Sequence, residues 1–391
     1  MDSTVMTRAA GAVRVEAPGR PVRFCVDVIT TREDLEDLAG EWNNLLFRSS
    51  ACDVFLTWEW ITAWLETINP HARLFVVIVR DEQGRLAAVG PFYQAHCTLL
   101  RLLGYRCLRI LGDTVSGSEY INIIARRDVE QDATIAVLSF LARHTGSWDL
   151  IWLPNMGPTG DAARSLQAAA RHVGFAFRTR GAEFASIRLP ESFEAYLGGL
   201  PAKIRYQMRR GLERLEQQHA GTLANCGEKS ALKASLEDLF TLHHSRWRER
   251  GTSDLFTEPR MRSFCHAMGL TMLEKGWLRL DRVIVGDRAV AAQIGFSFQG
   301  VFYELQRGFD PTFPNIPGGL GTALRSMVLR RCFSEGIRTY DFLGGFTEAK
   351  GRAGAERTNG CDMLIFRNSI ANELLHRSRA WPTGRYLRFS G

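Results

Sequence analysis

A glycine-rich turn, Asn315 to Thr322, leads directly into an amphipathic run that ends at Glu335. Glycines let the backbone approach a ligand closely, and the N–H groups at the start of a helix attract anions. Gly336 stands where the helix should end, and strands are predicted on either side, at 301–306 and 339–343. The pattern predicts a phosphate-binding turn whose candidate residues are Pro317, Gly318, Gly319, Leu320, Gly321 and Thr322.

Candidates for proton transfer lie on the two flanking strands. Glu304 interrupts an apolar strand, where burial would raise its pKa into the range of a base; a salt bridge to Arg307 is the structural alternative. Asp341 could be the base instead, or could bond to the backbone of the turn that follows it. Tyr303 is a candidate proton donor. Strand alternation places Glu304 and Gln306 on one face, so Gln306 joins the expected ligand-binding residues.

The elements that position these residues occur twice in the chain. Two similar predicted hairpins span 73–92 and 279–296, and each follows an aromatic-rich helical stretch. A helix and a strand then follow in each half, at 131–144 with 149–153 and at 321–335 with 339–343. We therefore predict two copies of one α+β unit, although two unrelated hairpins would show the same pattern.

The two predicted copies differ at the start of their helices. In the first half the helix is entered through Arg126-Arg127-Asp128-Val129-Glu130, which is acidic and contains no glycine. Negative side chains at a helix N-terminus compete with a bound anion, so only the second half is predicted to hold phosphate. The predicted division of the chain is a disordered lead-in 1–22, a degenerate unit 23–188, a basic connecting region 189–227, a ligand-binding unit 228–370 and a tail 371–391.

Composition excludes several classes of protein. The 391 residues are 45% hydrophobic and 23% charged, which is typical of a globular protein, and no apolar run approaches the ~20 residues that span a bilayer. The N-terminus has no apolar core of a secretory signal. The eight cysteines show neither CxxC nor zinc spacing, and the adjacent His243 and His244 diverge on a helix, so we expect reduced thiols, no metal and a cytoplasmic location.

A basic helix is predicted in the connecting region, at 201–214. The net charge of +7 permits a polyanionic partner without requiring one. Lys203, Arg205 and Arg209 are candidates for an anion-binding wall of the site, and a solvated face paired with Glu213 and Glu216 is the alternative. Trp58, in the first aromatic helix, is a candidate for the acceptor site, although such spacing more often places tryptophan in the core.

Taken together, these motifs resemble the BioF2-like acetyltransferase family, which includes the CelD/BcsL proteins of cellulose and exopolysaccharide production. That family belongs to the GNAT superfamily and resembles the Fem peptidyltransferases, which carry tandem GNAT units. The resemblance extends from about Arg23 to Phe366. The residues that carry it are Val54 to Trp60, Leu200 to Arg210, Phe309-Asp310-Pro311, Pro317-Gly318 and Asp341 to Gly345.

The resemblance implies a tandem GNAT fold with acyl-CoA as the donor. The pyrophosphate motif of the superfamily is Arg/Gln-x-x-Gly-x-Gly/Ala, and Gly319-Leu320-Gly321 fits its glycines. Ile316 departs from the first position and removes a side-chain donor, which leaves the backbone amides to bind the phosphate. The family often has Tyr-Lys after the later glycine pair; here Ala349 precedes Lys350. We expect Lys350 to contact the coenzyme, and Lys350 and Arg352 are candidates to contact phosphate or an acidic acceptor.

We therefore predict a GNAT-family N-acyltransferase that transfers an acyl group, most simply acetyl, directly from acyl-CoA to an amine of a sugar or small metabolite. Exopolysaccharide or cellulose biosynthesis is the context that the family implies. DNA is not an expected partner. Two alternatives remain: a Fem-like transferase that uses aminoacyl-tRNA, which the glycine turn disfavours, and a non-catalytic assembly partner of a polysaccharide synthase.

Overall fold

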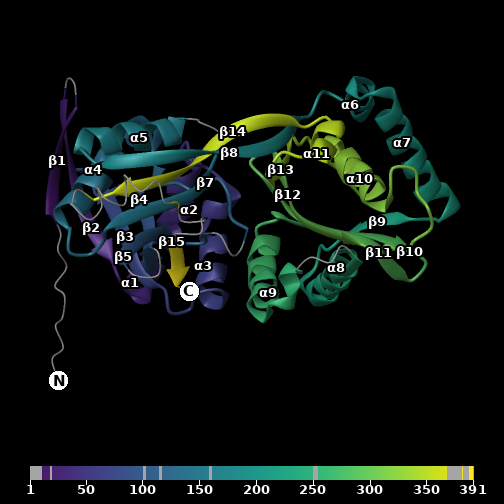
Figure 1. Ribbon diagram of the computed structural model, residues 1–391, viewed down its shortest axis with the longest axis horizontal. Helices are drawn as coiled ribbons and strands as arrows, with labels where there is room; N and C mark the ends of the chain where they lie inside the picture. The colour runs from purple at the N-terminus through teal and green to yellow at the C-terminus, as the bar shows by residue number, and fades with distance from the viewer. Residues whose placement is uncertain are drawn as a thin grey trace. The chain divides into compact units, whose positions relative to one another are not determined.

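The computed structural model describes residues 11–17, 20–99, 103–113, 117–157, 161–249, 254–367, 381 and 387–390 (Figure 1). The chain divides into two compact units. The first comprises 1–65, 69–182 and 359–391, and the second comprises 66–68 and 183–358. Two long strands, β8 (Ala176–Arg188) and β14 (Glu356–Phe366), contribute residues to both units.

The first unit is built on the strand order β1-β2-β3-β4-β5-β7-β14, in which β5 and β7 are parallel. Helix α4 packs against β1 to β4, and α5 packs on α4. Its helices are α1 (Arg32–Glu36), α2 (Ala39–Phe47), α3 (Trp58–Thr67), α4 (Glu130–Arg143) and α5 (Asp161–Val173). Its other strands are β1 (Gly11–Ala17), β2 (Arg20–Ile29), β3 (Arg73–Arg80), β4 (Leu86–Leu99), β5 (Leu103–Ile110), β6 (Ile124–Ala125), β7 (Leu150–Met156) and β15 (Leu387–Ser390).

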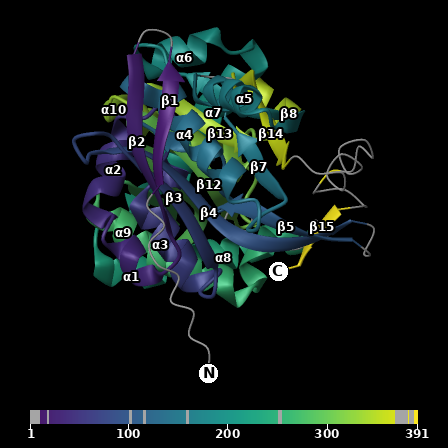
Figure 2. The ribbon, with the colours of Figure 1, turned by 90° about the vertical axis from the view of Figure 1, so that its left-hand side faces the viewer.

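Part of the expected disordered lead-in forms a strand. β1 pairs antiparallel with β2, from Gly11 opposite Val26 to Ala17 opposite Arg20, and the two strands run side by side in Figure 2. Val13 and Val15 alternate with other residues, as β-branched residues do in strands. The expectation of disorder rested on the composition of this segment, which does not show that β2 is available to pair with it. Residues 1–10 and most of the tail 371–391 lie outside the described residues, so the expectations for them stay predictions.

The second unit has the strand order β8-β13-β12-β11-β10-β9. Helix α10 lies on one face of this sheet, covered by α6 and α7, and α8 and α9 lie on the other face (Figure 1). Its helices are α6 (Phe193–Gly199), α7 (Ala202–Glu213), α8 (Lys229–Glu249), α9 (Pro259–Glu274), α10 (Leu320–Ser334) and α11 (Glu348–Arg352). Its other strands are β9 (Thr222–Asn225), β10 (Leu278–Val285), β11 (Arg288–Phe298), β12 (Val301–Phe309) and β13 (Thr339–Gly344).

The predicted repeat is confirmed by the topology. The hairpin β3–β4 corresponds to β10–β11, and each hairpin continues antiparallel into a third strand, β5 or β12. A helix, α4 or α10, then returns the chain to a parallel neighbour, β7 or β13. Both crossover helices begin and end within two residues of their predicted limits, and Gly336 follows α10 with a φ of 70°.

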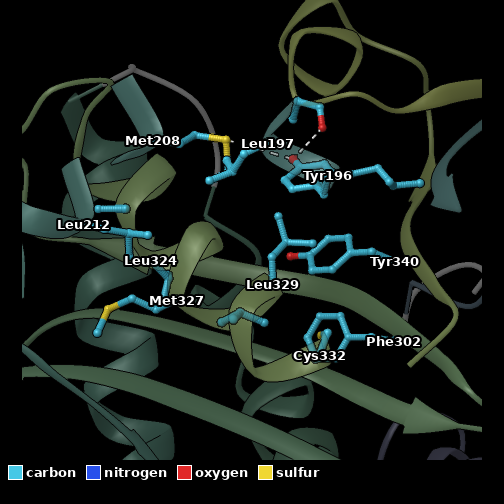
Figure 3. Close-up of a cluster of buried hydrophobic side chains, with 14 of the residues drawn as sticks. Tyr196, Leu197, Met208, Leu212, Phe302, Leu324, Met327, Leu329, Cys332 and Tyr340 are labelled. Atoms are coloured by element: carbon cyan, nitrogen blue, oxygen red, sulfur yellow. Dashed lines mark hydrogen bonds between the residues drawn. The ribbon is translucent and has the colours of Figure 1, made fainter. Parts of the chain in front are cut away.

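Apolar packing on both sides fixes the position of α10. Figure 3 shows its side chains between those of α6 and α7 above and those of β12 and β13 beside them. Leu324, Leu329 and Cys332 are fully buried, so the predicted amphipathic helix is covered on most of its surface rather than on one face. Full burial of each large apolar side chain stabilises the fold by about 1.5–3 kcal/mol, which holds the start of α10 in place.

Among the described helices, none has the length and apolar character that crossing a membrane requires.

Candidate active site

The site forms where two parallel strands of the second unit separate. β12 and β13 pair over only three positions, from Val301 opposite Thr339 to Tyr303 opposite Asp341. β12 then continues to Phe309, while the chain after β13 turns into α11. Beyond this point, Arg307 and Phe309 of β12 and Ala349 and Arg352 of α11 line a cavity at the N-terminus of α10.

A β-bulge in β12 determines which side chains face α10. Gln306 lies opposite Ile294 and Glu304 lies opposite Gly295, so Leu305 is an extra residue on β12. A Cβ atom on Gly295 would lie 2.2 Å from the carbonyl oxygen of Tyr303, and glycine is therefore required there. The bulge breaks the alternation from which we expected Glu304 and Gln306 on one face. Glu304 points toward α10, whereas the side chain of Gln306 bonds to His243 on α8.

The glycine turn presents backbone donors at the start of α10. Gly318 and Gly319 have φ values of 76° and 84°, and Gly319 is the N-cap. The N–H groups of Thr322 and Ala323 donate to the Gly319 oxygen at 3.0 and 3.2 Å. Those of Leu320 and Gly321 find no acceptor within the described part of the chain, so they are available to an anion.

The cavity at this helix start has a volume of about 440 Å³. Five of the residues that line it are basic and none is acidic, so the cavity suits a ligand with several negative charges. The residues that line the cavity are Lys203, Ile204, Gln207, Met208, Arg246, Arg307, Phe309, Gly318, Gly319, Leu320, Gly321, Thr322, Arg325, Ala349, Arg352 and Ala353.

Glu304 lies behind two of the cavity arginines. Its carboxylate accepts from Nε and Nη2 of Arg325 at 3.2 and 3.3 Å, lies 3.5 Å from Nε of Arg307 and accepts from the Tyr340 hydroxyl at 2.6 Å. Burial acts to raise the pKa of Glu304, but the two guanidinium groups and these hydrogen bonds outweigh it and lower the pKa to about 2. The expected raised pKa is therefore wrong, and the salt-bridge alternative describes the contacts. A carboxylate that binds a proton so weakly is a poor general base near pH 7.

The other two candidates for proton transfer meet where the strands separate. Tyr303 and Asp341 are directly opposed across β12 and β13, and both are buried. Asp341 Oδ1 accepts from the N–H of Leu343 at 2.7 Å, which agrees with the alternative that Asp341 bonds to the backbone of the following turn. Leu343 itself has a φ of 61°. Neither side chain belongs to the cavity lining. The catalytic roles of Glu304, Asp341 and Tyr303 stay predictions.

Among the expected ligand-binding residues, the turn from Gly318 to Thr322 lines the cavity, whereas Pro317, Gln306 and Lys350 do not. The Lys350 ammonium donates to the carbonyl oxygens of Phe342, Gly344 and Gly345 at 2.7–2.9 Å, closing the loop after β13. Arg352, two residues on, lines the cavity instead. Arg325 and Arg246 also line the cavity, and the sequence did not suggest either of them as a ligand-binding residue.

The expected acceptor-binding residues are dispersed. Lys203 lines the cavity, but Arg205 donates to the Gly198 carbonyl at 3.1 Å and Arg209 pairs with Glu194 on the exposed surface. Arg210 pairs with Glu213, as the solvated-face alternative anticipated. Trp58 belongs to the first unit, where it is half-buried.

Comparisons with known proteins agree with this architecture. Residues 202–351 match the family model described as an acetyltransferase (GNAT) domain, a range that contains all but two of the cavity residues. No curated protein matches the chain significantly in sequence. The solved structure of FemX is similar, with a TM-score of 0.62, 11% identity and coverage of 87% of this chain and 98% of FemX. The structure of a conserved protein of unknown function from Bacteroides thetaiotaomicron VPI-5482 is also similar, with a TM-score of 0.52 and 11% identity. The match covers 84% of this chain and 97% of that protein. The chain therefore has a mixed α/β fold similar to that of FemX, and residues 202–351 of its second unit resemble an acetyltransferase (GNAT) domain.

Proposed function

We propose that this chain is an acyl-CoA-dependent N-acyltransferase that acylates an amine of a sugar or small metabolite. The observation that carries the proposal is the basic cavity at the N-terminus of α10, beside the point where β12 and β13 separate. A coenzyme that carries phosphates on one end and a thioester on a narrow arm suits this combination. The phosphates would accept hydrogen bonds from the backbone N–H groups of Leu320 and Gly321, and the arm would enter between β12 and β13.

Direct attack of an amine on a thioester depends mainly on placement and on donors for the carbonyl oxygen. Glu304 remains ionised and held by arginines, so we assign it no part in removing the ammonium proton. Asp341 or solvent water would take that proton, since an acceptor amine loses it readily near its own pKa. Acyl transfer in exopolysaccharide or cellulose biosynthesis, in the cytoplasm, is the context that we propose from the family resemblance.

A donor built on tRNA is the rival proposal, and the exposed cations of α7 are what favour it. Arg209 and Arg210 project from that helix beside Tyr206, which is 61% exposed. Both arginines pair with glutamates, Glu194 and Glu213, and this pairing reduces the charge available to a polyanion. A non-catalytic partner of a polysaccharide synthase is the second rival, because Ile316 removes the side-chain donor from the pyrophosphate motif.

Calorimetric titration with acetyl-CoA and then with longer acyl-CoAs tests the proposal. We expect micromolar binding at about one site per chain, and the preferred chain length would identify the acyl group. Aminoacyl-tRNA binding with a steep salt dependence, without acyl-CoA binding, would favour the tRNA donor. Binding of neither donor would overturn the enzyme proposal and favour an assembly role.

A further inference from the structure

The glycine turn lacks the side-chain donor that its motif usually supplies. Ile316, at that position, is 2% exposed and belongs to the apolar cluster around α10. Gly211 of α7 packs against the same turn, where an added Cβ would lie 2.7 Å from the Pro317 oxygen. The turn therefore faces the protein interior on the Ile316 side, and any side-chain cation for a bound phosphate has to come from another element.

Arg307 and Arg325, from β12 and α10, are two cations that line the cavity beside the turn. Arg307 extends from β12, and its Nη1 donates to the Gly321 carbonyl at 3.3 Å, in the first turn of α10. Arg325 lies one turn further along α10. It uses Nε and Nη2 for Glu304, and its guanidinium also contacts the Tyr340 hydroxyl. Both guanidinium groups line the cavity.

The pair is held rigidly before any ligand arrives. The Arg325 side chain is only 8% exposed and its guanidinium carbon lies 4.8 Å from the centre of the Phe342 ring. Glu304, in turn, is fixed by the Tyr340 hydroxyl. A cation that is already ordered loses little conformational entropy when it binds an anion, so it binds more tightly than a flexible surface lysine would.

The charge around this pair is favourable for an anion. Two guanidinium groups contact the carboxylate of Glu304. Both arginines also border a cavity whose lining contains five basic residues and no acidic residue. A phosphate group of a ligand would therefore meet a positively charged wall there.

We propose that Arg307 and Arg325 bind a phosphate of the acyl donor and replace the side-chain donor lost at Ile316, and that Glu304 positions both arginines. The proposal rests on the proposed function for the identity of the donor, but the anion site itself is independent of it. Glu304 then affects turnover through donor binding and not through proton transfer.

The first test is Arg307→Gln, which leaves Glu304 paired with Arg325. We expect acetyl-CoA to bind about ten-fold more weakly at 50 mM NaCl, with the difference shrinking as salt screens the charge. Arg288→Gln is the matched control on the adjacent strand, since Arg288 is 59% exposed, pairs with Asp310 and lies outside the cavity. Equal affinity in wild type and Arg307→Gln, or a loss of the same factor at every salt concentration, would overturn the proposal.

A double variant, Glu304→Gln with Arg325→Met, tests the second arginine without leaving Glu304 as an unpaired charge. We expect a folded protein by circular dichroism and a loss of acetyl-CoA affinity larger than that of Arg307→Gln. Wild-type affinity in this variant would remove Arg325 from the site.

Inorganic diphosphate separates failure of this proposal from failure of the proposed function. If the wild type binds diphosphate in an Arg307-dependent way but binds no acyl-CoA, the anion site stands and the donor assignment falls. If the wild type binds acetyl-CoA and both variants bind it equally well, the donor assignment stands and the arginine site falls.

Discussion

The two units use one topology but begin their crossover helices differently. Helix α4 has Val129 as its N-cap and Glu130 and Asp132 in its first turn, and Glu130 accepts a hydrogen bond from Ser50 at 2.7 Å. Helix α10 has Gly319 as its N-cap and no acidic residue in its first turn. One helix start thus carries its own negative charge, whereas the other carries none, which favours an external anion.

A buried carboxylate in each unit shows the same contrast. Asp113 accepts from Arg109 Nε at 2.6 Å and from the Tyr93 hydroxyl at 3.0 Å. Glu304 has a tyrosine and two arginines, and both arginines border a cavity. Similar polar clusters thus lie in different surroundings: Asp113 is enclosed in the core of the first unit, whereas Glu304 holds two arginines at the wall of a cavity.

Neutralising each carboxylate should have the largest effect on stability. Glu304→Gln and Asp113→Asn each remove a buried carboxylate charge that pairs with a buried guanidinium, so both should lower the free energy of unfolding by about 3–5 kcal/mol. Denaturant unfolding measures this loss. Only Glu304→Gln should also weaken acetyl-CoA binding in the folded protein; an equal loss of affinity in Asp113→Asn would break the distinction between the two clusters.

Acid should remove the contribution of Glu304 to the free energy of unfolding, because it protonates the carboxylate. Its pKa is lowered from the usual 4.5 to about 2, so its stabilisation is complete above about pH 4.5 and is lost as the pH falls toward 2. The loss amounts to on the order of 3 kcal/mol at 1.36 kcal/mol per pKa unit. Thermal unfolding of wild type and Glu304→Gln from pH 6 to 2 measures it: the two curves should converge in acid. Parallel curves would show that Glu304 titrates normally.

Most of the fold of the second unit was predictable because its patterns are local. The glycine turn, the limits of α10 and the strand at 339–343 follow from turn residues and apolar periodicity, which are properties of short segments. The repeat was visible because both hairpins show the same order of a β-branched run, a turn and a pair of alanines, with turns that differ by two residues.

The orientation of the site residues was not predictable in the same way. The bulge at Leu305 depends on Gly295, ten residues away on another strand, and it reverses the face of every later residue of β12. Arg325 lies among apolar residues of α10, which suggests that it has a buried partner. The sequence does not show that this partner is Glu304, because the contact forms only when β12 and α10 pack together. The pKa of Glu304 depends on that same long-range packing.

Substituting the N-cap glycine sharpens the comparison of the helix starts. Gly319→Glu should weaken acetyl-CoA binding by about 100-fold, since its carboxylate would occupy the anion position of α10. Gly319→Ala controls for backbone strain at a φ of 84°, and no atom lies within 4 Å of its Cβ. Val129→Glu makes the equivalent change in α4 and should leave binding unchanged. Titration calorimetry compares all three, and donor binding by Gly319→Glu at wild-type strength would remove the phosphate assignment from this turn.

Lys350→Met should have the smallest effect, and it separates two roles for that lysine. Its ammonium donates to backbone carbonyls from Phe342 to Gly345, at the end of β13, so the structure predicts a loss of about 1 kcal/mol in unfolding free energy and less than a three-fold change in acetyl-CoA affinity. Arg85→Met, which removes an exposed pair with Asp81 in the first unit, is a control expected to cost less than about 0.5 kcal/mol. Denaturant unfolding and calorimetry on the same samples give both quantities. A ten-fold loss of affinity at unchanged stability would place Lys350 at the donor, as its position in the sequence predicted, and would require the loop after β13 to rearrange when the donor binds.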